Sequence, residues 1–185
     1  MDVLEAIKGR RSIRKYRPDP VPDQMLDEVL DAVRWAPSWA NTQCWEVIVI
    51  RDPGLKAKVA ETLPPGNPAL TSVKDAPVLV VFCAIRNLSG FKRGEATTDK
   101  GDWFMFDVGV AMENLCLAAH SLGLGTVMVG LFDARKVESL LAVPENFAVV
   151  AMTPLGYPDH DVSAPRRKEL VELVHHETYG KSKGG

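Results

Sequence analysis

The chain has 185 residues, of which 46% are hydrophobic, with a formal net charge of −2 and a sequence pI near 6.1. This composition predicts a compact domain with a substantial core, and the balanced charge argues against general binding of nucleic acids. Cys44, Cys83 and Cys116 are far apart and lie among apolar residues, which favours a reducing compartment over a disulfide framework. The N-terminus resembles no signal peptide, so we expect a cytoplasmic protein without a membrane partner.

Helical and extended segments alternate along the chain. Apolar residues at helical spacing, together with capping residues, glycines and prolines, predict helices over about 2–7, 22–36, 55–63, 103–122 and 133–141. Continuous apolar runs predict strands over 45–50, 78–84, 126–131 and 147–153. This alternation indicates a mixed α/β chain. We expect a single domain over 1–180 and a disordered tail over 181–185.

Two connections between these elements are irregular. Residues 64–68 form a stiff, proline-rich loop. The connection over 86–101 is polar, contains glycine and is longer than most connections in compact domains. Loops of this length often carry specificity.

The predicted helix over 103–122 is apolar on nearly all sides. A helix at the surface of a protein normally shows a polar face, and one without such a face is covered by the rest of a large domain or by a second subunit. Because this chain is short, burial by a second subunit is a serious option. A two-fold homodimer is the commonest way to achieve it.

A basic cluster near the N-terminus places the guanidinium groups of Arg10, Arg11 and Arg14 around the hydroxyl of Ser12. Arginine presents planar forks of N–H donors that match phosphate oxygens, and serine adds a short neutral donor. The cluster therefore suits a phosphate monoester. The alternative is a solvated basic surface or a patch that attracts polyanions.

A turn-forming loop precedes the first predicted strand and carries Pro37, Ser38, Trp39, Asn41 and Gln43. Asparagine and glutamine each offer a donor and an acceptor in one plane, which suits the edge of a heterocycle with carbonyl and ring N–H groups. An indole can stack on the same ring. The alternative is a polar connection whose tryptophans cap the core.

A C-terminal motif combines a turn over 153–158, which ends the last predicted strand, with Arg166 and Arg167 shortly afterwards. Proline and glycine in such a turn can expose backbone N–H groups to a flat ligand, and the arginines can complete a phosphate site begun at the N-terminus. Alternatively, the turn only redirects the chain and the basic residues face water.

Other motifs predict no metal site and no dinucleotide fold. His175 and His176 are adjacent in sequence, so their side chains converge poorly on one metal ion. Gly123 and Gly125 end a predicted helix and open a strand, which is the reverse of the order that pyrophosphate binding requires.

The order of these motifs resembles the FMN-dependent nitroreductase family, from about Leu4 to Tyr179. The resemblance is carried by RRSIRKY, APSWANTQCW, DVGVAMENLCLAAHSLGLGTVMVG, TPLGYP and PRRKELVELV. It implies an α+β fold with a central, mostly antiparallel sheet flanked by helices. It also implies an intertwined homodimer built around the long apolar helix, with FMN bound at the subunit interface.

The same resemblance implies roles for the motif residues. Arg10, Ser12 and Arg14, with Arg11 beside them, match the contacts to the phosphate, ribityl and pyrimidine parts of the flavin. The loop of the partner subunit that packs on the flavin ring is matched by Pro37, Ser38, Trp39, Asn41 and Gln43. Backbone N–H groups near flavin N5 are matched by Pro154, Leu155 and Gly156. Arg167, together with Arg166, matches the C-terminal phosphate contact.

The chain departs from the family pattern at two positions. Cys44 stands where the family often has proline, so the loop has one more free backbone N–H, and the match of Gln43 depends on this stretch. Leu155 stands where some members have glutamate, so a carboxylate near the flavin is absent.

The resemblance also implies the chemistry. The flavin carries the hydride at N5, so we expect no catalytic acid, base or nucleophile from the protein. NADH or NADPH reduces the flavin in a ping-pong cycle, and a nitroaromatic, a quinone or a similar acceptor is then reduced at the same site. We expect Arg14 to stabilise the negative charge of the reduced flavin. The acceptor pocket is shaped by Phe91, Trp103 and Phe104, or else these residues pack in the core or the dimer interface. The alternative function is an FMN-binding module for storage or sensing without efficient turnover.

Overall fold

A central antiparallel sheet organises the structure, a computed structural model that describes residues 1–182. The strand order is β1-β2-β6-β5, and all three pairings are antiparallel. The strands are β1 (Trp45–Ile50), β2 (Val78–Ile85), β5 (Gly125–Thr126) and β6 (Phe147–Gly156). A separate hairpin pairs β3 (Phe91–Lys92) with β4 (Glu95–Ala96).

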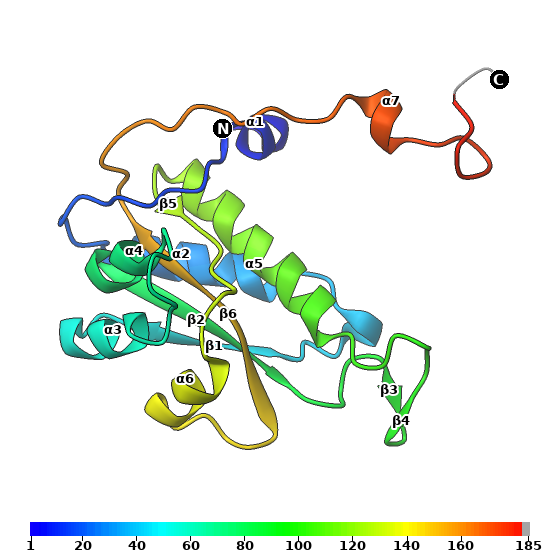
Figure 1. Ribbon diagram of the computed structural model, residues 1–185, viewed down its shortest axis with the longest axis horizontal. Coiled ribbons are helices and arrows are strands. Elements are labelled where there is room, and N and C mark those ends of the chain that lie inside the picture. The colour runs from blue at the N-terminus through cyan, green and yellow to red at the C-terminus, as the bar shows by residue number, and fades with distance from the viewer. Residues whose placement is uncertain (183–185) are drawn as a thin grey trace.

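Helices cover both faces of the sheet (Figure 1). They are α1 (Val3–Gly9), α2 (Asp23–Arg34), η1 (Trp39–Asn41), α3 (Pro53–Ala60), α4 (Leu70–Asp75), α5 (Phe104–Ser121), α6 (Ala134–Leu140) and α7 (Leu170–Leu173). The predicted α+β fold, with a mostly antiparallel sheet flanked by helices, is therefore confirmed.

Side chains of the sequence explain several helix starts. The carboxylate of Asp2 accepts hydrogen bonds from the backbone N–H groups of Leu4 and Glu5 and begins α1. Asp52 and Asp133 cap α3 and α6 in the same way. Each capping carboxylate satisfies N–H groups that have no partner within the helix.

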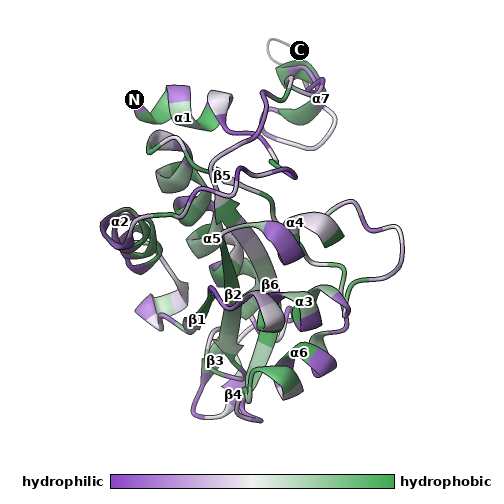
Figure 2. Cartoon of the chain, turned by 90° about the vertical axis from the view of Figure 1, so that its left-hand side faces the viewer, coloured by the Kyte–Doolittle hydropathy of each residue, from purple (hydrophilic) through white to green (hydrophobic). Residues whose placement is uncertain are grey.

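The core lies on both sides of β2. Alternate β2 residues such as Val80 and Phe82 pack with α2 and α5, whereas Leu79 and Val81 pack with α3, α4 and α6. A strand that is buried on both faces reads as a continuous apolar run, and β2 does so in the sequence. Figure 2 shows the green, hydrophobic strands β2 and β6 in the middle of the molecule.

The long helix α5 is covered only on part of its circumference. It packs against α2 and the sheet, and its buried residues include Val108, Leu115 and Cys116. Near its N-terminus, Met105 and Phe106 are 61% and 62% exposed. The chain itself therefore leaves part of this apolar helix without cover.

The structure corrects some predicted elements. The strand predicted over 126–131 is wrong beyond Thr126, because the chain then leaves the edge of β6 and rejoins it only at an isolated bridge between Val129 and Met152. The sequence did not predict α4, α7 or the β3–β4 hairpin. Of the tail predicted to be disordered, 183–185 lie outside the described residues, and the backbone N–H of Lys181 bonds to the carbonyl of Thr178.

The segment after β6 leaves the body of the protein. Figure 1 shows it in orange, passing α1 before it forms α7. Leu170 and Val171 of α7 are 76% and 72% exposed, and Tyr179 is 94% exposed. None of the helices within residues 1–182 is long and apolar enough to cross a membrane.

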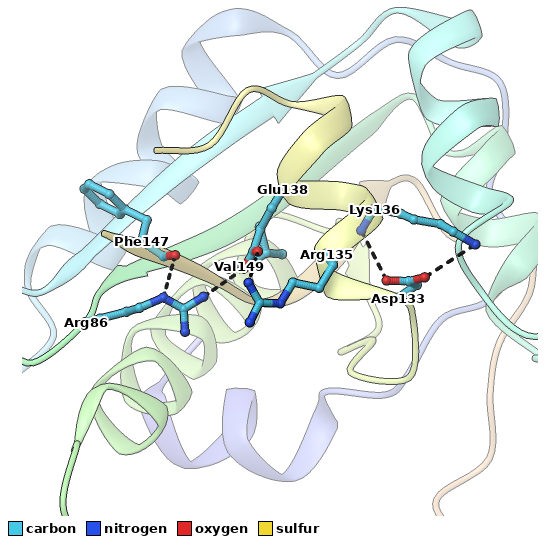
Figure 3. A network of polar contacts seen from close by, with 7 residues as sticks. All are labelled: Arg86, Asp133, Arg135, Lys136, Glu138, Phe147 and Val149. Atoms are coloured by element: carbon cyan, nitrogen blue, oxygen red, sulfur yellow. Dashed lines mark hydrogen bonds and ion pairs between the residues drawn. The ribbon is translucent and has the colours of Figure 1, made fainter. Parts of the chain in front are cut away.

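A polar network holds the beginning of the long 86–101 connection (Figure 3). The Nη2 atom of Arg86 lies 3.1 Å from Glu138 Oε1 on α6, and its Nε donates to the carbonyl of Phe147 at 2.8 Å. Glu138 also accepts from the backbone N–H of Val149. The connection therefore starts from a fixed point between α6 and β6.

Candidate functional site

The N-terminal basic segment is fixed along the edge of the sheet. Ser12 forms a parallel bridge with Thr126, and the backbone N–H of Ile13 donates to the Thr126 carbonyl at 2.8 Å. The hydroxyl of Tyr16 donates to the carbonyls of Ile13 and Pro154, and burial raises its pKa. The segment therefore has a fixed backbone from which the basic side chains project.

Gly125 makes this close approach possible. A Cβ atom at that position would lie 2.6 Å from Cγ1 of Ile13. Ile13 is buried and occupies the space that a side chain would need. The glycine therefore lets the N-terminal segment lie directly against β5.

A cavity of about 320 Å³ brings the two ends of the chain together. Its wall is formed by Arg10, Arg11, Ser12, Arg14, Val162, Ser163, Pro165 and Arg167. The predicted meeting of the N-terminal cluster with Arg167 is thus present in the geometry. Arg166 does not contribute to this wall. The guanidinium and hydroxyl donors here suit an anionic ester.

The arginines of this cavity differ in their surroundings. Arg10 pairs with Glu113 on α5, at 3.5 Å between Nε and Oε1. Arg11 Nη1 donates to the carbonyls of Lys8 and Arg10 at the end of α1, at 2.7 and 2.8 Å. Its buried Nε has no hydrogen-bond partner among the residues that the structure describes. Such an unsatisfied buried donor is costly.

A second cavity, of about 410 Å³, shares Arg14 with the first. It lies between 64–69 and 127–131, and the side-chain N–H of Asn67 joins these two segments by donating to the carbonyl of Leu131 at 3.1 Å. The sequence motifs did not mark these residues as part of the site. The only feature of the sequence that drew attention to this region was the stiff, proline-rich loop over 64–68.

The C-terminal motif is not the turn that the sequence suggested. Pro154, Leu155 and Gly156 are the last residues of β6, are buried, and pair with β2 and β5. A Cβ at the last strand residue, Gly156, would lie 2.6 Å from Cδ of Pro77, so only glycine fits there. None of these three residues lines either cavity.

The loop over 37–43 lies at the other end of α5. There Pro37, Ser38 and Trp39 line a separate cavity of about 220 Å³ with Trp103, Phe106 and Asp107 of the region around the start of that helix. Asn41 and Gln43 are exposed and joined to each other, at 3.3 Å between Gln43 Nε2 and Asn41 Oδ1. No residue is shared with the basic cavity. A single chain thus keeps the two predicted parts of the site apart.

The aromatic residues predicted for the acceptor pocket separate in the structure. The indoles of Trp103 and Trp39 pack with ring centroids 5.1 Å apart and an angle of 39° between their planes. Phe104 instead packs against the core beside α2. Phe91 lies in the β3–β4 hairpin and is not part of the wall of the 220 Å³ cavity. Only Trp103 therefore joins the loop over 37–43.

Comparisons with known proteins agree with this architecture. The sequence model of the nitroreductase family matches residues 7–157. A Methanothermobacter thermautotrophicus protein, provisionally named NADH dehydrogenase/NAD(P)H nitroreductase, is 39% identical over an alignment of 162 residues that covers 85% of this chain and 78% of that protein. The FMN reductase [NAD(P)H] of Bacillus subtilis is 34% identical over 191 residues, with 96% of this chain and 74% of that protein covered.

A solved structure gives the same result for the fold. The FMN-dependent nitroreductase of Clostridium difficile R20291 superposes with a TM-score of 0.80 at 26% identity, covering 96% of this chain and 100% of that one. The fold, the order of the motifs and the match over 7–157 agree with one another. The chain belongs to the nitroreductase family.

Proposed function

We propose that the protein is an NAD(P)H-dependent FMN oxidoreductase that reduces nitroaromatic, quinone or similar acceptors. The observation that carries the proposal is the 320 Å³ cavity in which Arg10, Ser12 and Arg14 meet Arg167. Relatives named FMN reductase and NADPH-flavin oxidoreductase support the flavin and the reductant. We take residues 1–180 as the single FMN-binding domain.

The residues of the cavity fit the phosphate end of FMN. Arg10, Arg14 and Arg167 line one small space, so their guanidinium groups can supply charge-assisted donors to a phosphate. We assign the phosphate to Arg10, Ser12 and Arg167. Arg14 lines the larger cavity as well, so we assign the flavin ring to the side of Arg14 that faces 64–69 and 127–131.

The remaining contacts predicted for the ring require a second copy of the chain. Pro37, Ser38, Trp39, Asn41 and Gln43 belong to a loop that shares no residue with the basic cavity. We propose that this loop contacts the FMN of a partner subunit in a two-fold homodimer. The exposed apolar side chains of α5 and α7 support this proposal, because large exposed apolar surfaces mark interaction sites.

The chain itself supplies binding and electrostatics. When bound, FMN supplies the electron-transfer chemistry, and the residues around it hold and orient it. The positive charge of Arg14 favours negative charge on its ligand, which is the charge that reduction produces. We propose that the nicotinamide and the acceptor occupy the same site in turn, which predicts ping-pong kinetics.

The visible spectrum of the purified protein tests this proposal. We expect FMN absorption that bleaches when NADH or NADPH is added without oxygen and returns when a nitroaromatic or a quinone follows. Protein that stays colourless after incubation with FMN would contradict the assignment of the cavity. Bound flavin that neither nicotinamide reduces would favour an FMN storage or sensing module.

A further inference from the structure

The carboxylate of Asp107 is fully buried in the first turns of α5. Its Oδ1 accepts the backbone N–H of Trp39 at 3.0 Å, and its Oδ2 accepts the same group at 3.2 Å. Oδ2 also accepts the hydroxyl of Ser89 at 2.6 Å and the thiol of Cys44 at 3.6 Å. All of these donors are neutral groups, and they come from two loops that are far apart in sequence.

The thiol contact has the character of a hydrogen bond from a protonated cysteine. Burial, first of all, and then the neighbouring charge of Asp107 raise the pKa of Cys44 to about 12. The thiol therefore keeps its proton at neutral pH and acts as a donor. Cys44 also fixes the end of the first loop, because its carbonyl accepts the backbone N–H of Ile85 at 2.8 Å.

The loop over 37–44, which is anchored through the backbone N–H of Trp39, has unfavourable backbone dihedral angles. Ala40, Asn41 and Gln43 have φ values of 44°, 55° and 46°, in the left-handed region. This region disfavours residues other than glycine, most clearly the alanine, which has no polar side chain to compensate. Such a conformation persists only where surrounding contacts determine it. The bonds from the loop to Asp107 are contacts of this kind.

The loop held by Ser89 leads into the same aromatic cluster. The backbone N–H of Trp103 donates to the Ser89 carbonyl at 3.0 Å, and the Trp103 indole N–H donates to Thr98 Oγ1 at 2.9 Å. A Cβ on Gly90 would lie 2.4 Å from Cδ1 of Trp103, so the indole packs directly on the backbone of this loop. Ser89 thus fixes Trp103, and Trp103 contacts Trp39.

We propose that Asp107 is a positioning residue that couples the loop over 37–44 to the connection over 86–103, so that the second loop influences how tightly the first contacts the flavin. The inference rests on the proposed function for its effect on FMN. The coupling arises because both loops donate to one carboxylate. Without the Ser89 hydroxyl, the carboxylate of Asp107 gains freedom to rotate about its last side-chain bond. The backbone N–H of Trp39 then loses its fixed acceptor.

The variant Ser89→Ala tests the coupling with little disturbance of the core. Thr62→Ala is the matched control, since Thr62 is also buried and donates its hydroxyl to a carbonyl, that of Val59, away from both loops. Backbone hydrogen exchange is measured by mass spectrometry on the full-length proteins, and FMN affinity is measured by quenching of flavin fluorescence. Asp107→Asn is the second variant, because the N–H groups of its amide would face the N–H, hydroxyl and thiol groups that now donate to the carboxylate.

We expect Ser89→Ala to speed exchange over 38–44, a loop to which Ser89 does not belong, and to raise the dissociation constant of FMN on the order of threefold. Asp107→Asn should increase both effects, and Thr62→Ala should produce neither. Faster exchange confined to 86–103 would overturn the coupling. Coupled exchange with unchanged FMN affinity would overturn its proposed influence on the flavin. Wild-type protein that binds no FMN would instead contradict the proposed function, and the exchange data alone would then decide whether Asp107 couples the loops.

Discussion

The Nε atom of Arg10 lies 3.5 Å from Oε1 of Glu113, which joins the N-terminal basic segment to the middle of α5. The two side chains are 20% and 41% exposed, so water screens their attraction and the pair contributes little to stability. The contact is made through Nε, and Arg10 also lines the basic cavity. The pair therefore ties Arg10 to α5 at the wall of that cavity.

Replacing Glu113 with glutamine should strengthen FMN binding about twofold to fivefold. Glutamine keeps the size of the side chain, while the negative charge that repels a phosphate disappears, a change worth about 0.5–1 kcal/mol at a partly exposed site. Titration at two salt concentrations checks the prediction, because the difference from the wild type should shrink as salt rises. Weaker binding by the variant would mean that the charge of Glu113 is needed to orient Arg10.

Replacing Arg14 with alanine should weaken FMN binding or lower the flavin potential. Arg14 lines both cavities, and its positive charge favours the more negative, reduced state of the ligand. We expect the midpoint potential to fall by about 30 mV, which corresponds to about 1.4 kcal/mol for two electrons. Equilibration with a reference dye measures this potential.

The matched control for this prediction is Arg14→Lys, which keeps the charge and loses the planar fork. The midpoint potential of the flavin in this variant should stay close to that of the wild type, even where FMN binding weakens. Unchanged affinity and unchanged potential in Arg14→Ala would remove this residue from the site.

Replacing Gly156 with alanine should destabilise the protein by about 1–3 kcal/mol, as overpacking of a core does. The new Cβ would lie 2.6 Å from Cδ of Pro77 and 3.2 Å from Cδ1 of Tyr16. Gly130→Ala is the control, because a Cβ there would meet no atom within 4 Å. Urea denaturation of both variants measures the free energy of unfolding, and equal losses would refute the predicted clash.

The stability of the protein should fall on acidification through the titration of His120. Burial, followed by the charges of Arg10 and Arg11, lowers the pKa of this imidazole from its ordinary value of 6.5. His120 lines a further cavity, of about 400 Å³, together with His160 and Asp161. A lowered pKa in the folded state means that folding favours the neutral form. Its contribution to stability is therefore complete above pH 6.5 and declines as the pH falls below that value.

The variant His120→Gln removes this contribution without a large change in size. Its free energy of unfolding should depend less steeply on pH below 6.5 than that of the wild type. Identical slopes in urea denaturation across pH 5 to 7 would exclude His120 as the cause.

The sequence predicted the fold well where one strong local pattern decides the structure. The strand Trp45–Ile50 was predicted with its observed bounds, and the prediction for β2 ended one residue too early. Both strands contain continuous apolar runs, which few other structures in a domain of this kind would explain. The strand predicted over 126–131 was wrong beyond Thr126, because strand pairing depends on the course of the neighbouring strand β6 as well as on the local sequence. Val127 and Val129 are buried like strand residues, although the backbone there makes only one bridge.

The candidate site was predictable where charge marks it. Arg10 and the distant Arg167 line one cavity, and their assignment to a phosphate stays a prediction. The role of Asp107 was not predicted, because the sequence does not show which groups surround this aspartate. Its partners Trp39 and Ser89 are distant in sequence and meet it only in the folded structure. The roles assigned to Pro154, Leu155 and Gly156 stay predictions.

The basic cavity draws its wall from both ends of the chain, Arg10–Arg14 and Arg167. A ribosome releases these segments at very different times. A nascent chain that has folded its sheet as far as β6 still lacks Arg167, and it holds the proposed phosphate site half built. The cofactor should therefore bind fully only after Arg167 has left the ribosome, when the sheet is already formed, and should stabilise that sheet rather than direct its formation.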